Sequence, residues 1–174
     1  DPLGVAETYG TDAVRMALVV GTAAGNDPVI SEDKIRGYRN FATKVWNVAR
    51  FVLMSRPERL PKTVQPSAQD RRDLAELKRV KAKVTRYLEA FQFHRAAEDL
   101  YHYVWHTFAD QVLERAKPRL KGTNRTDQAA AYYTLETILT ESVKMLHPFM
   151  PFVTEAIYRE FPRRASKLLM VATW

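Results

Sequence analysis

The apolar residues of this chain recur at helical spacing along most of its 174 positions. Between residues 37 and 52 they stand three or four positions apart, which places them on one side of a helix. This apolar stripe consists of Tyr38, Phe41, Val45, Val48, Ala49 and Val52. Similar stripes mark residues 74–91 and 135–146. The pattern therefore predicts a chain built from helices.

Capping residues and helix breakers indicate where these helices begin and end. The expected helices cover residues 2–10, 11–21, 31–56, 67–91, 94–117, 126–146 and 152–161. Thr11, Ser31 and Thr126 are the expected N-caps, Pro118 is expected to close the helix before it, and the proline-rich residues 57–67 form a linker or long loop. Helices joined by short loops pack antiparallel, so we predict an all-α antiparallel helix bundle.

Composition narrows the function classes. The chain has no cysteine, which excludes disulfides and thiolate metal sites and fits a reducing cytoplasm. No apolar run approaches the roughly 20 residues that cross a bilayer, and the first residues do not resemble a signal peptide. Lysine and arginine exceed aspartate and glutamate by 27 to 20, a net charge of +7, which favours an anionic partner.

A polar stripe lies opposite the apolar one in residues 37–52. Asn40, Lys44, Asn47 and Phe51 share one helical face, and the phenylalanine is unexpected there. Arg39 and Arg50 lie eleven residues apart on an adjoining face. Cations for phosphates, amides for base edges and a ring for stacking are typical of single-stranded RNA binding. On the pattern alone, packing of Phe51 under a neighbouring helix is the favoured alternative.

A second basic stretch follows Glu114 and contains no acid before Asp127. Its members are Arg115, Lys117, Arg119, Lys121 and Arg125. Cations suit a helix C-terminus in any case, so the helix dipole accounts for some of them. The remaining residues are as consistent with a phosphate-contacting surface as with a solvated one.

A third group of residues would fit a metalloenzyme. Asp99, His102, His106 and Asp110 fall on a single helical face, and histidines four residues apart can share a metal ion. Metal sites in bundles usually draw carboxylates from several helices, so hydrogen bonds between these side chains are the favoured explanation and we predict no metal site. We find no nucleophile motif and no phosphate-binding glycine loop, so no catalytic residue is predicted.

Several motifs, in the right order, resemble those of valyl-tRNA synthetases, which are class I aminoacyl-tRNA synthetases. They are DPLGVAETYGTDAVRMAL, GTAAGNDPVISEDKIRGYRNFATKVWNVARFV, YHYVWHTFADQVLERAKP and KMLHPFMPFVTEAIY. The resemblance implies the end of the stem-contact region, after the KMSKS loop, at residues 1–30, an anticodon-binding helical bundle at 31–162 and a C-terminal tail at 163–174. Isoleucyl- or leucyl-type siblings, or a helical interaction module without RNA binding, are the alternatives.

The resemblance also implies a function for the fragment. It would bind the anticodon of tRNA-Val and position this tRNA for aminoacylation by an ATP-dependent valine–tRNA ligase, as a cytoplasmic monomer. The catalytic and editing domains, with their ATP, would lie elsewhere in the parent enzyme, so no cofactor is expected here. In this family, positions matching Phe51 and Lys44 touch anticodon bases, and the position matching Glu114 faces the same place.

Overall fold

The structure is a computed structural model that describes residues 2–21, 30–61, 63–162 and 164–174. In these ranges every regular element is a helix, which confirms the predicted all-α class. The elements are α1 (Pro2–Tyr9), α2 (Thr11–Val19), α3 (Glu32–Met54), α4 (Ala68–Glu89), α5 (Phe93–His102), the π-helix η1 (Tyr103–Val112), α6 (Leu113–Lys121), α7 (Arg125–Leu146), α8 (Pro151–Arg159) and the 3-10 turn η2 (Leu169–Val171). Asp1 and most of the segment GTAAGNDPVI lie outside the described residues. None of the described helices has the length and apolarity that a membrane span requires.

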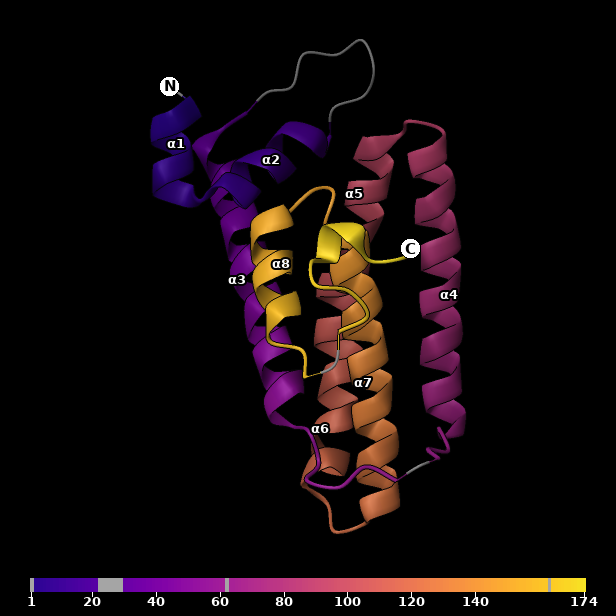
Figure 1. Ribbon diagram of the computed structural model, residues 1–174. Coiled ribbons are helices and arrows are strands. Elements are labelled where there is room, and N and C mark those ends of the chain that lie inside the picture. The colour runs from indigo at the N-terminus through magenta and orange to yellow at the C-terminus, as the bar shows by residue number, and fades with distance from the viewer. Residues whose placement is uncertain (1, 22–29, 62, 163) are drawn as a thin grey trace.

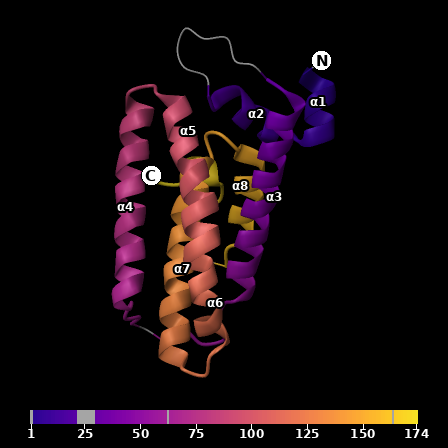
Figure 2. The same ribbon diagram turned by 180° about the vertical axis from the view of Figure 1, so that it is seen from behind.

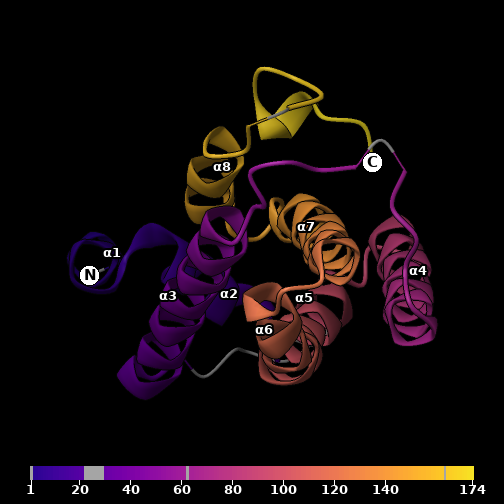
Figure 3. The same cartoon turned by 90° about the horizontal axis from the view of Figure 1, so that it is seen from below.

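The long helices form an antiparallel bundle, as predicted (Figure 1). The segments α5, η1 and α6 follow one another without a break and make a single rod that packs against α7. Seen from below, α3 and α4 lie on opposite sides of the bundle, with α7 and the α5–α6 rod between them (Figure 3). The residues that join α3 to α4 therefore cross the end of the bundle instead of forming a tight hairpin.

The core forms where the predicted apolar stripes meet. The stripe of α3 is buried at Phe41, Val45, Val48, Ala49 and Val52. It packs with large buried side chains from the rod and from α7, among them Phe108 and Tyr132. Burial of these apolar surfaces is the main stabilising contribution in such a bundle.

Two of the predicted helix starts are confirmed, and at two others a different residue stands at the N-cap. Ser31 caps α3, because its Oγ accepts a hydrogen bond from the Lys34 N–H at 3.2 Å, and Ser67 forms a capping box with Asp70. Thr11 is the first residue of α2 and not its cap. Asn124, instead of Thr126, caps α7, because its side chain accepts from the N–H groups of both Thr126 and Asp127 and so satisfies two free donors of the first turn.

Pro118 does not close a helix, contrary to the sequence prediction. It lies inside α6, which continues to Lys121. A proline removes one N–H and crowds one carbonyl, but packing against a neighbouring helix can compensate for this. Here α6 packs along α7, and the Gln128 amide donates hydrogen bonds to the carbonyl oxygens of Leu120 and Gly122 at the end of α6.

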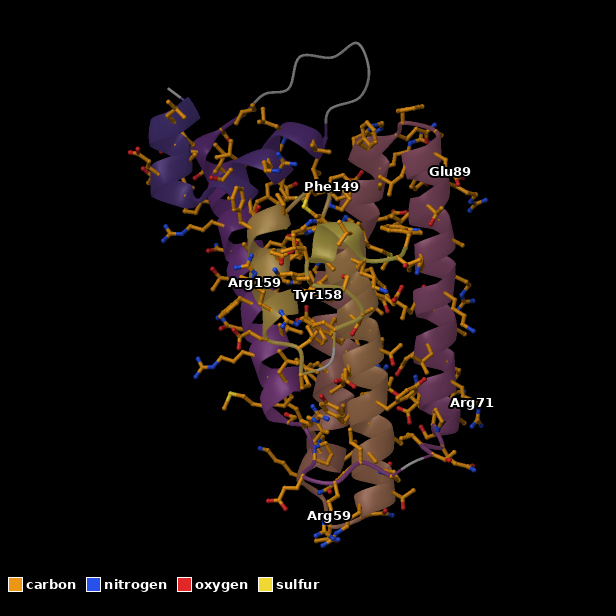
Figure 4. The ribbon with its side chains drawn as sticks, viewed as in Figure 1. Arg59, Arg71, Glu89, Phe149, Tyr158 and Arg159 are labelled. Carbon is orange, nitrogen blue, oxygen red and sulfur yellow. The ribbon has the colours of Figure 1, made fainter. Side chains whose placement is uncertain are left out.

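The N-terminal helices are tied to the far end of the chain. Asp12 of α2 is buried and accepts hydrogen bonds from the N–H groups of Phe152 at 3.2 Å and Val153 at 2.6 Å, so it caps α8 from a distance. Burial raises the pKa of Asp12 above its usual value, although these bonds oppose the shift. Arg15 donates to the carbonyl oxygens of Pro148 and Phe149, the latter labelled in Figure 4 near the start of α8.

The C-terminal tail docks on the bundle. Leu169 is buried in the main core, and its N–H donates to Glu155 of α8 at 2.9 Å. The Trp174 indole N–H donates to the Thr85 hydroxyl of α4 at 2.8 Å. In Figure 1 the tail runs across α7 from α8 toward α4. The domain boundaries predicted at residues 30/31 and 162/163 stay predictions; α2 packs against α3, and Leu169 of the tail is buried in the main core.

Candidate nucleic-acid interface

The predicted polar stripe lies where α3 runs beside the α5–α6 rod, a side seen in Figure 2. We call this line of contact the seam; its residues are Lys44, Phe51, Trp105, Asp110, Glu114 and Lys117. Asn40 and Asn47 are exposed beside it, with amides available for hydrogen bonding. The structure therefore brings the stripe of α3 and the predicted Glu114 to one face.

Lys44 is held by two side chains of η1. Its ammonium lies 2.6 Å from Asp110 Oδ1 and 4.4 Å from the centre of the Trp105 ring. An ammonium over an indole face gains a favourable cation–π interaction. The hydrogen bond from Lys44 lowers the pKa of Asp110, so this carboxylate is ionised at neutral pH.

Phe51 is neither an exposed ring nor a core residue. Its side chain is half-buried and packs at the edge of the main core. The Lys117 ammonium stands 5.7 Å from the centre of its ring, and Lys117 also pairs with Glu114 one turn earlier. One part of the ring thus contributes to packing, while the other part lies among charged groups at the surface.

Arg39 and Arg50 of α3 are both exposed. Arg50 lines a groove of about 410 Å³ on the α8 side of α3, together with Trp46, Leu53, Met54 and Ile157. Trp46, 39% exposed, lies on the edge of α3 that lines this groove. Arg50 and the polar stripe therefore lie on neighbouring faces of α3.

The second basic stretch divides into paired and exposed residues. Arg115 forms an ion pair with Asp73 of α4 at 2.9 Å, and Lys117 forms one with Glu114. Lys121 and Arg125 are exposed, and neither forms an ion pair with another described residue. Lys121 and Arg125 are therefore the members of this stretch with charge most available to an anion.

Arg119 is engaged within the protein. Its guanidinium makes a two-pronged ion pair with Asp70, at 2.7 and 2.9 Å, and a further bond to Asp127. Burial alone would raise the pKa of Asp70, but the hydrogen bonds from Arg119 and Ser67 outweigh it and hold the pKa below its usual value. With its donors occupied, Arg119 ties α6 to the starts of α4 and α7.

A polar groove lies at the end of the bundle beside this ion pair network. It has a volume of about 440 Å³ and is lined by Pro57, Glu58, Arg59, Arg125 and Gln128. Figure 4 shows Arg59 at this end of the molecule. Sequence reasoning assigned no role to Arg59, because only the path of the α3–α4 connector brings it next to Arg125.

Of the four residues considered as a metal site, the two aspartates form ion pairs with other helices. Asp99 pairs with Lys83 of α4 at 2.7 Å, and Asp110 pairs with Lys44 of α3. The His102 and His106 rings stack with their centres 5.7 Å apart, and His106 lies 3.6 Å from Asp110. In the described part of the chain, no three metal-binding side chains come together.

The sequence pattern did not predict the π-helix η1. Such segments often occur at functional sites.

Comparison with known proteins supports an RNA-related role. Residues 70–174 match the family model described as the anticodon-binding domain of tRNA ligase. The valine–tRNA ligase of Geobacter sulfurreducens is 40% identical over 178 residues, covering 99% of this chain and 20% of that protein. That of Nitratidesulfovibrio vulgaris is 39% identical over 170 residues, covering 95% of this chain and 19% of that protein. The chain thus spans about a fifth of the length of these curated relatives.

Solved structures share the fold. Methionyl-tRNA synthetase of Mycobacterium tuberculosis, in its apo form, superimposes with a TM-score of 0.75 at 23% identity, covering 90% of this chain and 34% of that one. The LeuRS of Agrobacterium radiobacter K84, in a ternary complex, superimposes with a TM-score of 0.68 at 22% identity. The match covers 97% of this chain and 20% of that one. The predicted bundle of the class I synthetase anticodon-binding type is therefore confirmed. Because the family model covers more than half of its residues, the chain belongs to the family of anticodon-binding domains of tRNA ligases.

Proposed function

We propose that this chain is the anticodon-binding module of an ATP-dependent valine–tRNA ligase and positions tRNA-Val for aminoacylation. The observation that carries the proposal is the similarity, at 33–40% identity over nearly the whole chain, to proteins named valine–tRNA ligase. The seam and the two asparagines beside it, Asn40 and Asn47, supply a physical basis, because together they offer ammonium groups, amides and a half-buried ring.

The bases of the anticodon loop would bind along the seam. Phe51 offers the exposed part of its ring for stacking, which is worth about 1 to 3 kcal/mol per base in other proteins. Lys44, Asn40 and Asn47 can hydrogen-bond base edges, and Glu114 can accept a hydrogen bond from a base amino group.

Phosphates would bind the cations around the seam. The exposed Arg39 and Arg50 would contact phosphates along α3. The exposed Lys121 and Arg125 would contact phosphates at the end of the bundle. Phosphate contacts position the RNA without reading its sequence.

The paired cations have a different proposed role. Arg119 supports the fold, since Asp70 and Asp127 already occupy its donors. Arg115 and Lys117 keep ion pairs that an RNA phosphate would have to replace, so they are secondary phosphate contacts.

The remaining domains of the same synthetase are the proposed permanent partners of this chain. Amino-acid activation, with its ATP, would take place in the catalytic domain, so the fragment itself uses no cofactor and carries out no chemistry. We propose a cytoplasmic, monomeric parent enzyme. Size-exclusion chromatography of the parent would test its oligomeric state.

A titration with anticodon stem-loops of valine and isoleucine tRNAs, at two salt concentrations, tests the proposal. The expected result is tighter binding of the valine loop, with an affinity that falls as salt rises. Tighter binding of the isoleucine loop would favour an isoleucyl-type sibling, and equal binding of both loops would overturn the assignment to valine. Absence of salt-dependent binding would leave a helical interaction module and overturn the proposal.

A further inference from the structure

Asp110 forms an ion pair with Lys44, the lysine that would read a base in the proposed function. The Lys44 ammonium and the Asp110 carboxylate are 2.6 Å apart, and both side chains reach solvent, with 29% and 46% exposed. The Trp105 ring supports the ammonium 4.4 Å away. His106 flanks the second carboxylate oxygen at 3.6 Å and stacks on His102. The ammonium of Lys44 is therefore placed by two side chains of one element, η1, and His106 of the same element flanks the carboxylate.

An unpaired lysine at this place would be expected to bind phosphate. The lysine ammonium is a compact point charge, and phosphates are the strongest and most numerous anions of an RNA loop. Such a contact carries no sequence information. A free Lys44 would therefore raise the affinity for every RNA hairpin alike.

Asp110 changes what Lys44 can bind. The carboxylate offsets the charge of the ammonium and repels a nearby phosphate. It uses only one of the three N–H donors, so two remain for the neutral acceptors of a base edge. The pair thus keeps the hydrogen-bonding capacity of Lys44 while weakening its attraction for phosphate.

We propose that Asp110 is a specificity-determining residue that restricts Lys44 to base contacts by excluding phosphate from its ammonium. This inference rests on the proposed function, in which the seam binds the anticodon loop. Trp105 acts as a positioning residue in the same arrangement, because it fixes the direction of the lysine side chain.

The arrangement is not explained by stability alone. Both partners are partly exposed, and exposed ion pairs contribute little to folding. Asp110→Asn should therefore leave the melting temperature almost unchanged, and the amide oxygen can still accept a hydrogen bond from Lys44. The variant removes the negative charge and preserves the shape.

The test is a titration of wild type and Asp110→Asn with valine and isoleucine anticodon stem-loops at several salt concentrations. The variant should bind the isoleucine loop about five to ten times more tightly, the size expected when one close like-charge contact near a surface is removed. Its affinity for the valine loop should rise less, so selectivity falls. The salt slope should steepen by about 0.7 to 1, because Lys44 gains a phosphate contact.

Two further variants isolate the mechanism. Glu76→Gln is the matched control, because Glu76 is a 44% exposed acid that pairs with Arg79 on α4, on the opposite side of the bundle from α3. It should change neither affinity nor selectivity. In a Lys44→Met background, Asp110→Asn should change the affinity for the isoleucine loop less than about twofold, since no ammonium is released.

Three other outcomes would contradict either this inference or the proposed function. Unchanged selectivity in Asp110→Asn, with a wild type that still prefers the valine loop, would overturn this inference and leave the proposed function intact. A gain that persists in the Lys44→Met background would show general repulsion by Asp110 and also overturn it. A wild type that binds both loops equally, or neither, would instead refute the proposed function.

Discussion

Replacing Arg119 tests whether this arginine supports the fold or contacts RNA. Its guanidinium is 23% exposed and forms the ion pair with Asp70, whose side chain is only 3% exposed. In Arg119→Ala, the Asp70 carboxylate stays buried and loses both bonds from the guanidinium. Breaking a buried pair on one side usually destabilises a protein by about 3 to 5 kcal/mol. We expect about 3 kcal/mol here, because the Ser67 N–H still donates to the Asp70 carboxylate and Arg119 is partly solvated.

The assay is unfolding by heat and by denaturant. A loss of about 3 kcal/mol should lower the melting temperature by about 6 to 12 °C in a domain of this size. Lys121→Ala is the matched control, since Lys121 is an exposed cation two residues further along. It should change stability by less than about 0.5 kcal/mol while weakening all RNA hairpins alike.

The pH dependence gives a second readout of the same pair. The pKa of Asp70 is below its usual value in the folded protein. The ion pair therefore stabilises the fold fully at pH values above the pKa that Asp70 has in the unfolded chain. This stabilisation is lost as the pH falls through the lower pKa that Asp70 has in the folded protein. In Arg119→Ala, acid also neutralises the stranded carboxylate. The stability difference between wild type and variant should therefore narrow below about pH 4. An Arg119→Ala protein that melts like the wild type but binds RNA as poorly as Lys121→Ala would refute the structural role.

Three other substitutions give distinct outcomes. Phe51→Ala should lower the free energy of unfolding by about 1 to 3 kcal/mol, less than a fully buried phenylalanine, and also weaken the valine stem-loop; stability loss without any change in RNA binding would contradict the stacking role. Trp46→Ala should lower the melting temperature and leave the preference for the valine loop unchanged; lost selectivity at an unchanged melting temperature would be the contrary result. Leu169→Ala should destabilise the protein by about 2 to 4 kcal/mol in denaturant unfolding, because the tail is part of the core; an unaltered midpoint would mean that the tail does not dock in solution.

The sequence by itself determined the helices and the class of the fold. Apolar residues three and four positions apart specify which face of α3 is buried. Burying a continuous apolar stripe is favourable whichever helix packs against it. Ser31 and Ser67 mark helix starts through bonds to residues three positions away, which are local and therefore readable. The family motifs in order predicted the fold type that the comparisons confirm.

Only the tertiary structure decided how the polar residues are used. Five cations of the second basic stretch look equivalent along the chain, yet Arg119 meets Asp70, 49 residues earlier, while Lys121 is exposed. Lys44 meets Asp110, 66 residues later, and the π-helical segment that carries Asp110 had no sequence signal that we recognised. Which charged side chains pair depends on which helices become neighbours. The paths of the long connections between helices determine those neighbours. The periodicity of a single helix predicts which side is buried, but it does not specify the partner that each polar group meets there.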